Sequence, residues 1–186
     1  MFKDKRSKMI VLVAHCILNQ NSKIDGCAYY PGPIKGVAEL LMSAGCGIVQ
    51  LPCPELMHLG LDRRVDRQSA RTIEAEDTRV ARLMSENAGR SCCRQIAEEA
   101  AYQVQEYLKN GFEVGGMLGI NGSPTCGVET IWAERQEEPG RGVLIQELVE
   151  ACQGRGVSLH FKGIKAAKPG EAIATTKEML WSLAAQ

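Results

Sequence analysis

The sequence predicts an α/β fold, in which an open and mostly parallel β-sheet is covered by helices on both faces. Short apolar, β-branched segments alternate along the chain with longer segments whose apolar residues recur every three or four positions. The length supports one core, because 186 residues with 45% hydrophobic content suit one compact unit. We therefore expect residues 1–186 to form a single domain.

The first half of the chain starts with a strand, a loop and a helix. The apolar run 9–15 is typical of a strand buried on both faces, and it leads to Cys16. The next stretch is rich in turn residues, and a helix is expected over 34–44 with Gly45 at its end. A second strand, 47–51, runs into two prolines that should stop regular pairing and hold an extended turn.

The second half repeats the alternation after a charged segment. Residues 59–90 are dense in arginine and acidic residues, and we expect a long excursion with one or two exposed helices. Ser91 is expected to cap a helix that ends near Asn110. The remaining expected elements are a glycine-rich strand over 114–120, a charged loop, a helix over 143–153, a strand over 157–164 and a last helix from Pro169.

Strands that alternate with helices imply parallel pairing through right-handed crossovers. The expected sheet is therefore Rossmann-like or flavodoxin-like, and in such sheets ligands bind beyond the carboxyl ends of the strands. Cys16, Cys53 and Cys126 each follow the carboxyl end of an expected strand. The fold is thus expected to gather, at one edge of the sheet, three thiols that lie 37 and 73 residues apart in the sequence.

The composition bears on partners and compartment. Lysine plus arginine equals aspartate plus glutamate at 22 each, so the charge favours neither a nucleic acid nor a membrane as partner, and a small molecule is expected. No stretch reaches the roughly 20 apolar residues that span a bilayer, and the N-terminus shows no cleavage signature. We expect a cytoplasmic protein, whose eight cysteines serve packing, catalysis or metal binding rather than disulfides.

The three cysteines at strand ends predict a centre for a soft metal. Three thiolates leave one coordination position open, as a catalytic metal requires, and an iron–sulfur cluster with one exchangeable iron fits. Zinc also accepts thiolate ligands, so the sequence leaves the metal open. Cys53 lies between two prolines and Cys126 follows Ser-Pro-Thr, neither a core-packing context, whereas Cys46 and Cys152 are expected to pack in the core.

Polar residues near the same strand ends are candidates for work on a substrate. Glu55 lies two residues after the second of these cysteines, so its carboxylate is expected to act as a general base. Asn19, Asn121 and Ser123 offer neutral groups that can orient a polar ring or a developing oxyanion. Arg63 is a candidate for binding a phosphate or carboxylate, with a solvated charged face as the alternative.

Three ordered motifs resemble those of the thiouracil desulfidase family, over about residues 9–165. They are Ala14-His-Cys-Ile-Leu-Asn19 with Ile24-Asp-Gly26, Pro52-Cys-Pro-Glu55, and Ser123-Pro-Thr-Cys-Gly127. The resemblance implies a Rossmann-like domain that binds a [4Fe-4S] cluster through Cys16, Cys53 and Cys126. The fourth iron would be free to take a sulfur atom, and such an open cluster is oxidatively fragile in air.

The activity implied by the resemblance is removal of sulfur from a thiolated pyrimidine. The thiocarbonyl becomes a carbonyl and sulfide is released, without net oxidation or reduction. Glu55 would assist proton transfer or water attack, and Ser123 or Asn121 would steady the ring. The chain departs from the family pattern at Lys23 and Ile24, where the best-known members have an arginine-tyrosine pair, so a different substrate pocket is expected.

Other classes of function use the same residues. A non-enzymatic iron–sulfur or sulfide-binding protein would need the three cysteines but not Glu55. A zinc-binding Rossmann-like module would use the same thiolates. An ordinary nucleotide-binding module needs a glycine-rich turn after the first strand, and His15-Cys-Ile-Leu-Asn19 has no glycine there. The sequence leaves the thiolated compound and the oligomeric state open.

Overall fold

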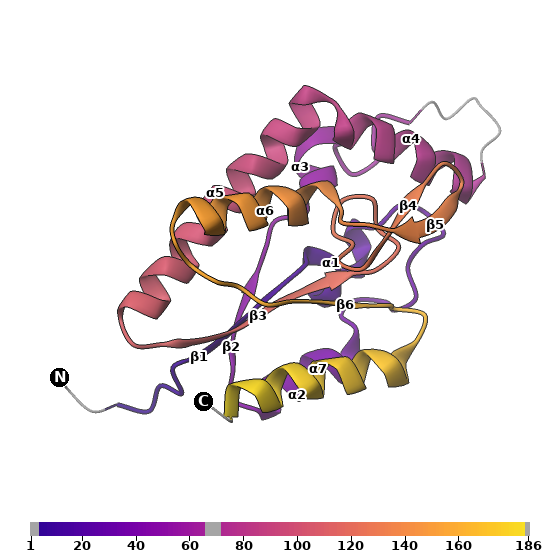
Figure 1. The fold of residues 1–186 in the computed structure, drawn as a ribbon. Helices are drawn as coiled ribbons and strands as arrows, with labels where there is room; N and C mark the ends of the chain where they lie inside the picture. Colours follow the sequence, from indigo (N-terminus) through magenta and orange to yellow (C-terminus); the bar gives the residue numbers. More distant parts are fainter. Residues whose placement is uncertain (1–3, 66–71, 185–186) are drawn as a thin grey trace.

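The computed structural model describes residues 4–65 and 72–184, and it contains a four-stranded parallel sheet between two helical layers (Figure 1). The strands of this sheet are β1 (Met9–Val13), β2 (Gly47–Gln50), β3 (Glu113–Ile120) and β6 (Phe161–Ile164). Their order across the sheet is β2-β1-β3-β6, and every pair is parallel. The expected α/β architecture is therefore confirmed as a single Rossmann-like or flavodoxin-like domain.

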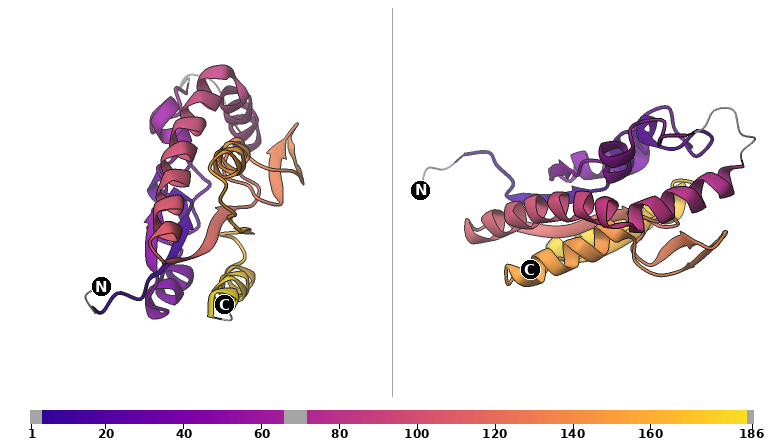
Figure 2. Two further views of the ribbon diagram at one scale, coloured as in Figure 1. Left: turned by 60° about the vertical axis from the view of Figure 1, so that its left-hand side comes forward. Right: turned by 90° about the horizontal axis from the view of Figure 1, so that it is seen from above.

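Helices cover both faces of the sheet. The helices of one layer are α5 (Asn87–Lys109) and α6 (Val143–Gly154), and those of the other are α2 (Lys35–Ser43) and α7 (Pro169–Ala184). Figures 1 and 2 show the two layers on opposite sides of the strands. The centre of β1 is completely shielded, with Val11 and Val13 at 0% exposure, because strands between two helical layers are buried on both sides.

Two expected boundaries near the first helices are wrong. The two prolines do not hold an extended turn, because Pro54 begins helix α3 (Pro54–Leu59), where its missing N–H and fixed φ suit the first turn. Ser91 is not a helix cap, because α5 already begins at Asn87 and Ser91 lies inside it. The charged excursion contains α4 (Ile73–Ser85), as expected of a helical segment, and its residues 66–71 lie outside the described part.

The charged loop expected after Cys126 contains an antiparallel hairpin. Its strands are β4 (Thr130–Ala133) and β5 (Gln136–Pro139). The two turn residues, Glu134 and Arg135, both have positive φ, as a tight hairpin turn requires. Because glycine or asparagine usually occupies such positions, the sequence carried no hairpin signal here. In Figure 1 the hairpin projects from the sheet toward α4.

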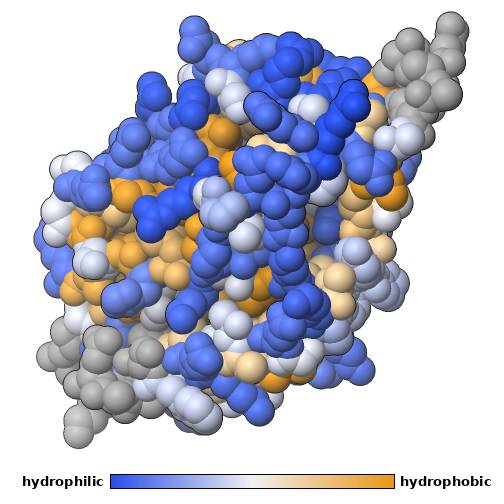
Figure 3. All heavy atoms as spheres, turned by 45° about the vertical axis from the view of Figure 1, so that its right-hand side comes forward, coloured by the Kyte–Doolittle hydropathy of each residue, from blue (hydrophilic) through white to orange (hydrophobic). Residues whose placement is uncertain are grey.

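The rest of the chain follows the expected order with small shifts. The last strand begins at Phe161 rather than at residue 157, and two short helical segments follow β1, namely α1 (His15–Leu18) and η1 (Gln20–Ser22). None of the helices in the described part of the chain has the length and apolar character that crossing a membrane requires. On the face shown in Figure 3, hydrophilic and hydrophobic residues are interspersed.

Candidate functional site

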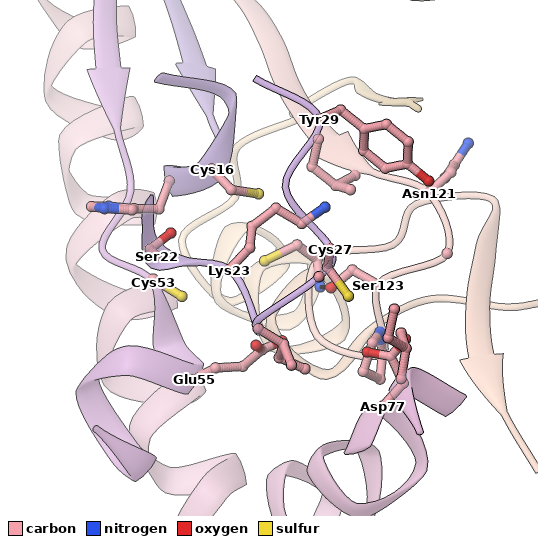
Figure 4. A pocket seen from close by; sticks show the side chains of 18 residues that line it. Cys16, Ser22, Lys23, Cys27, Tyr29, Cys53, Glu55, Asp77, Asn121 and Ser123 are labelled. Carbon is pink, nitrogen blue, oxygen red and sulfur yellow. Dashed lines mark hydrogen bonds between the residues drawn. The ribbon is translucent and has the colours of Figure 1, made fainter. Parts of the chain in front are cut away.

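A cavity of about 280 Å³ opens beyond the carboxyl ends of β1, β2 and β3 (Figure 4). Its lining includes Cys16, Cys53 and Cys126. Parallel strands present their carboxyl ends at one edge of a sheet, which is why segments so distant in sequence meet here. The structure thus brings the three cysteines expected from strand ends into one cavity.

Each of the three cysteines is held by a different local element. Cys16 lies on α1, directly after β1, and Cys53 is the residue that precedes the first turn of α3. Cys126 lies in a turn after β3, where the Ser123 hydroxyl oxygen accepts hydrogen bonds from the backbone N–H groups of Thr125 (3.2 Å) and Cys126 (3.0 Å). Ser123 therefore shapes the turn that presents Cys126.

Glycines let the Cys126 turn pack tightly against its neighbours. A Cβ on Gly119 of β3 would meet the carbonyl oxygen of Cys126, and a Cβ on Gly142 would meet the Thr125 carbonyl group and lie 2.8 Å from the Cys126 nitrogen. Such contacts with backbone atoms cannot be relieved by rotating a side chain. The position of Cys126 therefore depends on these small residues.

Replacing Gly142 with alanine is expected to destabilise the protein by about 1–3 kcal/mol, the usual cost of overpacking a tight site. The added methyl group would push against the backbone of the Cys126 turn. Urea unfolding of Gly142→Ala and the parent measures the difference. The matched control is Gly154→Ala, at the last residue of α6, the helix that Gly142 caps. No heavy atom lies within 4 Å of its added Cβ, so this variant should be no less stable than the parent. Equal stability of Gly142→Ala and the control would contradict the expectation.

Burial keeps the three thiols uncharged in the absence of a ligand. It raises the pKa of Cys16 to about 12, with Lys23 acting in the opposite direction. Burial likewise raises the pKa of Cys53 and, to a larger extent, that of Cys126. Cys16 and Cys53 also raise the Cys126 pKa, because a second negative charge nearby disfavours the thiolate. Thiols of this kind become good ligands only when a metal takes the place of the proton.

The candidate donors are three soft thiol groups. Among the described residues, no three His, Cys, Asp or Glu side chains are arranged to hold a single metal ion. Zinc would need its thiolates about 2.3 Å from one centre. An iron–sulfur cluster is wider than a single ion and binds its thiolates at separate irons. Cys16, Cys53 and Cys126 all line one cavity, and three thiolates are the kind of donor that an iron–sulfur cluster takes.

Glu55 lies in the same cavity and is held firmly. Its carboxylate accepts a hydrogen bond from the Thr125 hydroxyl (2.8 Å) and one from Nε of Arg63 (3.3 Å). The side chain is 13% exposed. Because Thr125 precedes Cys126, and Glu55 follows Cys53 by two residues, this hydrogen bond joins two of the three cysteine segments and fixes the carboxylate between them.

Arg63, a candidate for binding a phosphate or carboxylate, is buried and is held by protein acceptors. Its side chain is 2% exposed and its five N–H donors go to protein acceptors. The acceptors are the Glu55 carboxylate, the carbonyl oxygens of Gly60, Leu61 and Ser22, and the Cys53 sulfur at 3.8 Å. No donor is left for a phosphate, so Arg63 fixes the positions of Glu55 and Cys53.

The two asparagine candidates have different positions. Asn121 lines the cavity, but its side-chain oxygen accepts from the backbone N–H groups of Val128 and Glu129, at 3.2 and 3.1 Å, and closes the loop after β3. Asn19 is not among the cavity-lining residues. Its side-chain oxygen accepts from the backbone N–H of Asn21 (3.2 Å) and caps η1.

The far side of the cavity contains Lys23, at which the sequence analysis expected a different pocket, and three residues that sequence reasoning missed. Lys23 and Cys27 come from the loop after η1, and Ile73 and Asp77 come from α4. The loop residues lie next to the Ile24-Asp-Gly26 segment of the first motif, which is a signal that could have identified them. Asp77 had no comparable signal, because only the folded chain reveals which face of α4 turns toward the cysteines.

Comparison with known proteins gives one informative similarity. A protein of Methanocaldococcus jannaschii with the name "Uncharacterized protein MJ0003" is 34% identical to this chain over 148 residues, which cover 80% of each protein. No protein-family model and no solved structure matches the chain.

Proposed function

This chain belongs to the same family as MJ0003 of Methanocaldococcus jannaschii, and we propose that it is an iron–sulfur-dependent desulfidase acting on a thiolated, pyrimidine-like small molecule. The observation that carries the proposal is the meeting of Cys16, Cys53 and Cys126 with Glu55 in one cavity. The three cysteines would hold a [4Fe-4S] cluster. When bound, such a cluster supplies an open iron site with affinity for sulfur.

The cavity suits a small ring with polar edges. Its wall combines the apolar side chains of Ile24, Ile73 and Ile120 with the aromatic ring of Tyr29 and with a few polar groups. Ligand cavities of enzymes typically have this mixture, in which apolar surface gives affinity and sparse polar groups fix orientation. The volume of about 280 Å³ favours a small molecule over a polymer.

Glu55 is positioned to act on a water molecule. Desulfuration of a thiocarbonyl requires a water oxygen to bond to the carbon, and the carbon–sulfur bond to break with its electron pair on sulfur. A carboxylate beside the reacting carbon can take the proton that water loses. The hydrogen bonds from Thr125 and Arg63 orient Glu55 and leave the outer lone pairs of its oxygens for that proton.

Ser123 has a structural role and one remaining donor. Its oxygen accepts the N–H groups of the Cys126 turn, which leaves the hydroxyl proton to be donated. Because Ser123 lines the cavity, that proton can stabilise negative charge that develops on the substrate. Asn121, which keeps the loop after β3 closed, contributes to the wall on the same side.

The test is anaerobic reconstitution with iron and sulfide, followed by an assay of sulfide release from 2- and 4-thiouracil. We expect about four irons per chain, broad absorption near about 400 nm from thiolate-bound iron, and conversion of thiocarbonyl to carbonyl. Protein that takes up no iron and stays colourless in this experiment would refute the proposal.

Glu55→Gln separates an enzyme from a carrier of iron–sulfur clusters or sulfide. Glutamine keeps the shape of the side chain but cannot take a proton, so sulfide release should fall by about 100- to 10,000-fold while iron content stays the same. Glu39→Gln, on the exposed surface of α2, is the matched control and should resemble the parent. A reconstituted parent that releases no sulfide and is indistinguishable from Glu55→Gln would favour the carrier.

A further inference from the structure

Asp77 is a carboxylate inside the cavity that the chemistry above does not use. It lies on α4, and Figure 4 shows it across the cavity from Cys16 and Cys53. None of the hydrogen bonds or ion pairs found among residues 4–65 and 72–184 involves this carboxylate. A partly buried carboxylate without such a partner has lost water contacts and gained no protein donor in return, so it is available to a ligand.

Helix α4, which carries Asp77, is hydrogen-bonded both to Arg63 and to the β4–β5 hairpin. Nη2 of Arg79 donates to the backbone carbonyl of Arg63 (2.9 Å), and Arg63 in turn holds Glu55. On the other side, the indole N–H of Trp132 in the hairpin donates to the hydroxyl of Thr78 (3.3 Å). These contacts are made by the two residues that follow Asp77, and they hold its turn of α4 beside the cavity.

Lys23 supplies the opposite charge in the same cavity. Its ammonium group lies 5.8 Å from the centre of the Tyr29 ring, and both side chains line the cavity. Figure 4 shows Lys23 between the cysteine side of the cavity and the far side, and it acts electrostatically on both Cys16 and Asp77. The far side of the cavity therefore offers one strong acceptor, one strong donor and one aromatic face.

We infer that Asp77 and Lys23 form a recognition pair for the edge of the ring that points away from the reacting sulfur, with Asp77 accepting a ring N–H and Lys23 donating to the adjacent carbonyl oxygen. The inference rests on the proposed function and names the substrate class as an uncharged cyclic thioamide with an N–H and carbonyl edge. A ring with this edge satisfies both side chains at once, and hydrogen bonds to charged groups are the strong ones.

The pKa of Asp77 suits a carboxylate that accepts a hydrogen bond from a ligand near neutral pH. Burial, and then Glu55 on α3, raise the pKa of Asp77 to about 6, against the attraction of Lys23. The other titratable groups that act on it or line the cavity beside it are Glu74 and Glu76 on its own helix, Cys27 in the preceding loop, and His15 on α1. Above about pH 6 the carboxylate is ionised and is a strong acceptor for an N–H, and below that value the protonated carboxyl group is a weaker one.

The experiment measures binding of uracil, which has the ring but no sulfur, to cofactor-free and to anaerobically reconstituted protein by calorimetry. Asp77→Ala should weaken binding about 10- to 150-fold, as expected for a hydrogen bond to a charged group. Lys23→Met should weaken it by a similar factor. In the parent, the affinity for uracil should fall as the pH is lowered through about 6. In Asp77→Asn, the affinity should not change over this pH range.

Methylated rings identify the atom that Asp77 contacts. The parent should bind either 1-methyluracil or 3-methyluracil much more weakly than uracil, whereas Asp77→Ala should bind uracil and that methylated ring equally, because the lost contact is the same one. Glu39→Gln, on the exposed surface of α2, is the control for charge and should resemble the parent. Melting curves and the Asp77→Asn variant, which keeps the side-chain shape, separate loss of binding from loss of folding.

The outcomes separate this inference from the proposed function. Equal uracil affinity of Asp77→Ala and the parent, absence of uracil binding to both forms of the parent, or equal binding of all three rings would overturn the recognition pair. Ring binding that depends on Asp77 in a protein that releases no sulfide would retain the pair and refute the desulfidase. Sulfide release with a KM that Asp77→Ala leaves unchanged would retain the desulfidase and refute the pair.

Discussion

Cys53→Ser and Cys126→Ser should each reduce the iron content of anaerobically reconstituted protein to the background level and abolish sulfide release. The serine hydroxyl is a hard oxygen donor that is protonated at neutral pH, and it does not replace a soft thiolate at iron. Iron and acid-labile sulfide per chain, together with the visible absorption spectrum, measure the first effect. Loss of one ligand removes one third of the protein donors, so no partial cluster of the same kind is expected.

The matched control for these variants is Cys46→Ser. Cys46 is a free cysteine like the others, but it lies before β2 at the opposite end of that strand and is not among the residues that line the cavity. It should bind the parent's amount of iron and release sulfide at the parent's rate. Full iron content in Cys53→Ser or Cys126→Ser would show that the cluster is held elsewhere, and would remove the basis of the proposed function.

Arg63→Met is expected to cost about 3–5 kcal/mol of stability, the usual cost of removing one partner from a buried ion pair. The Arg63 guanidinium serves five acceptors at once, including Glu55 and the Cys53 sulfur, and methionine has a similar volume but no donor. Chemical unfolding under reducing conditions measures the change. Because Glu55 and Cys53 both lose an anchoring contact, iron uptake should fall as well.

Arg64→Met is an adjacent control with the same change in composition. Arg64 has almost the same backbone conformation as Arg63, with φ of 54° against 55°, but it is exposed and its side-chain bond goes to the carbonyl oxygen of His58 (2.8 Å). Its replacement should change stability by no more than about 0.5 kcal/mol. If the double variant Arg63→Met/Glu55→Gln were as unstable as the sum of the single variants, the ion pair would not account for the loss.

Sequence pattern predicted the sheet and the meeting of the cysteines because both depend on local signals. A β-branched run that ends at Cys16, and another that ends before Cys53, each identify a strand end, and parallel topology then places those ends side by side. The start of α5 was wrong because Ser91 has the residue type of a cap while the chain actually turns four residues earlier, at Asn87.

The far wall of the cavity could not be predicted, because it is made by tertiary contacts. The orientation of α4 is set by the hydrogen bonds of Arg79 and Trp132 to partners 16 and 54 residues away, and no periodicity in 59–90 encodes them. The role of Arg63 was missed for a related reason. An arginine in a charged segment is usually solvated, and only the convergence of five acceptors on one guanidinium reveals a buried one.

Because β3 lies beside β1 in the sheet but far after it in the sequence, the site is completed late in synthesis. A ribosome releases Cys16 and Cys53 long before Cys126, and the third thiol reaches the others only after β3 has paired with β1. Before Cys126 is synthesised, a nascent chain therefore has two of the three thiols and an incomplete cavity. It follows that a group bound by all three cysteines cannot be fully held until Cys126 has been synthesised and β3 has joined the sheet.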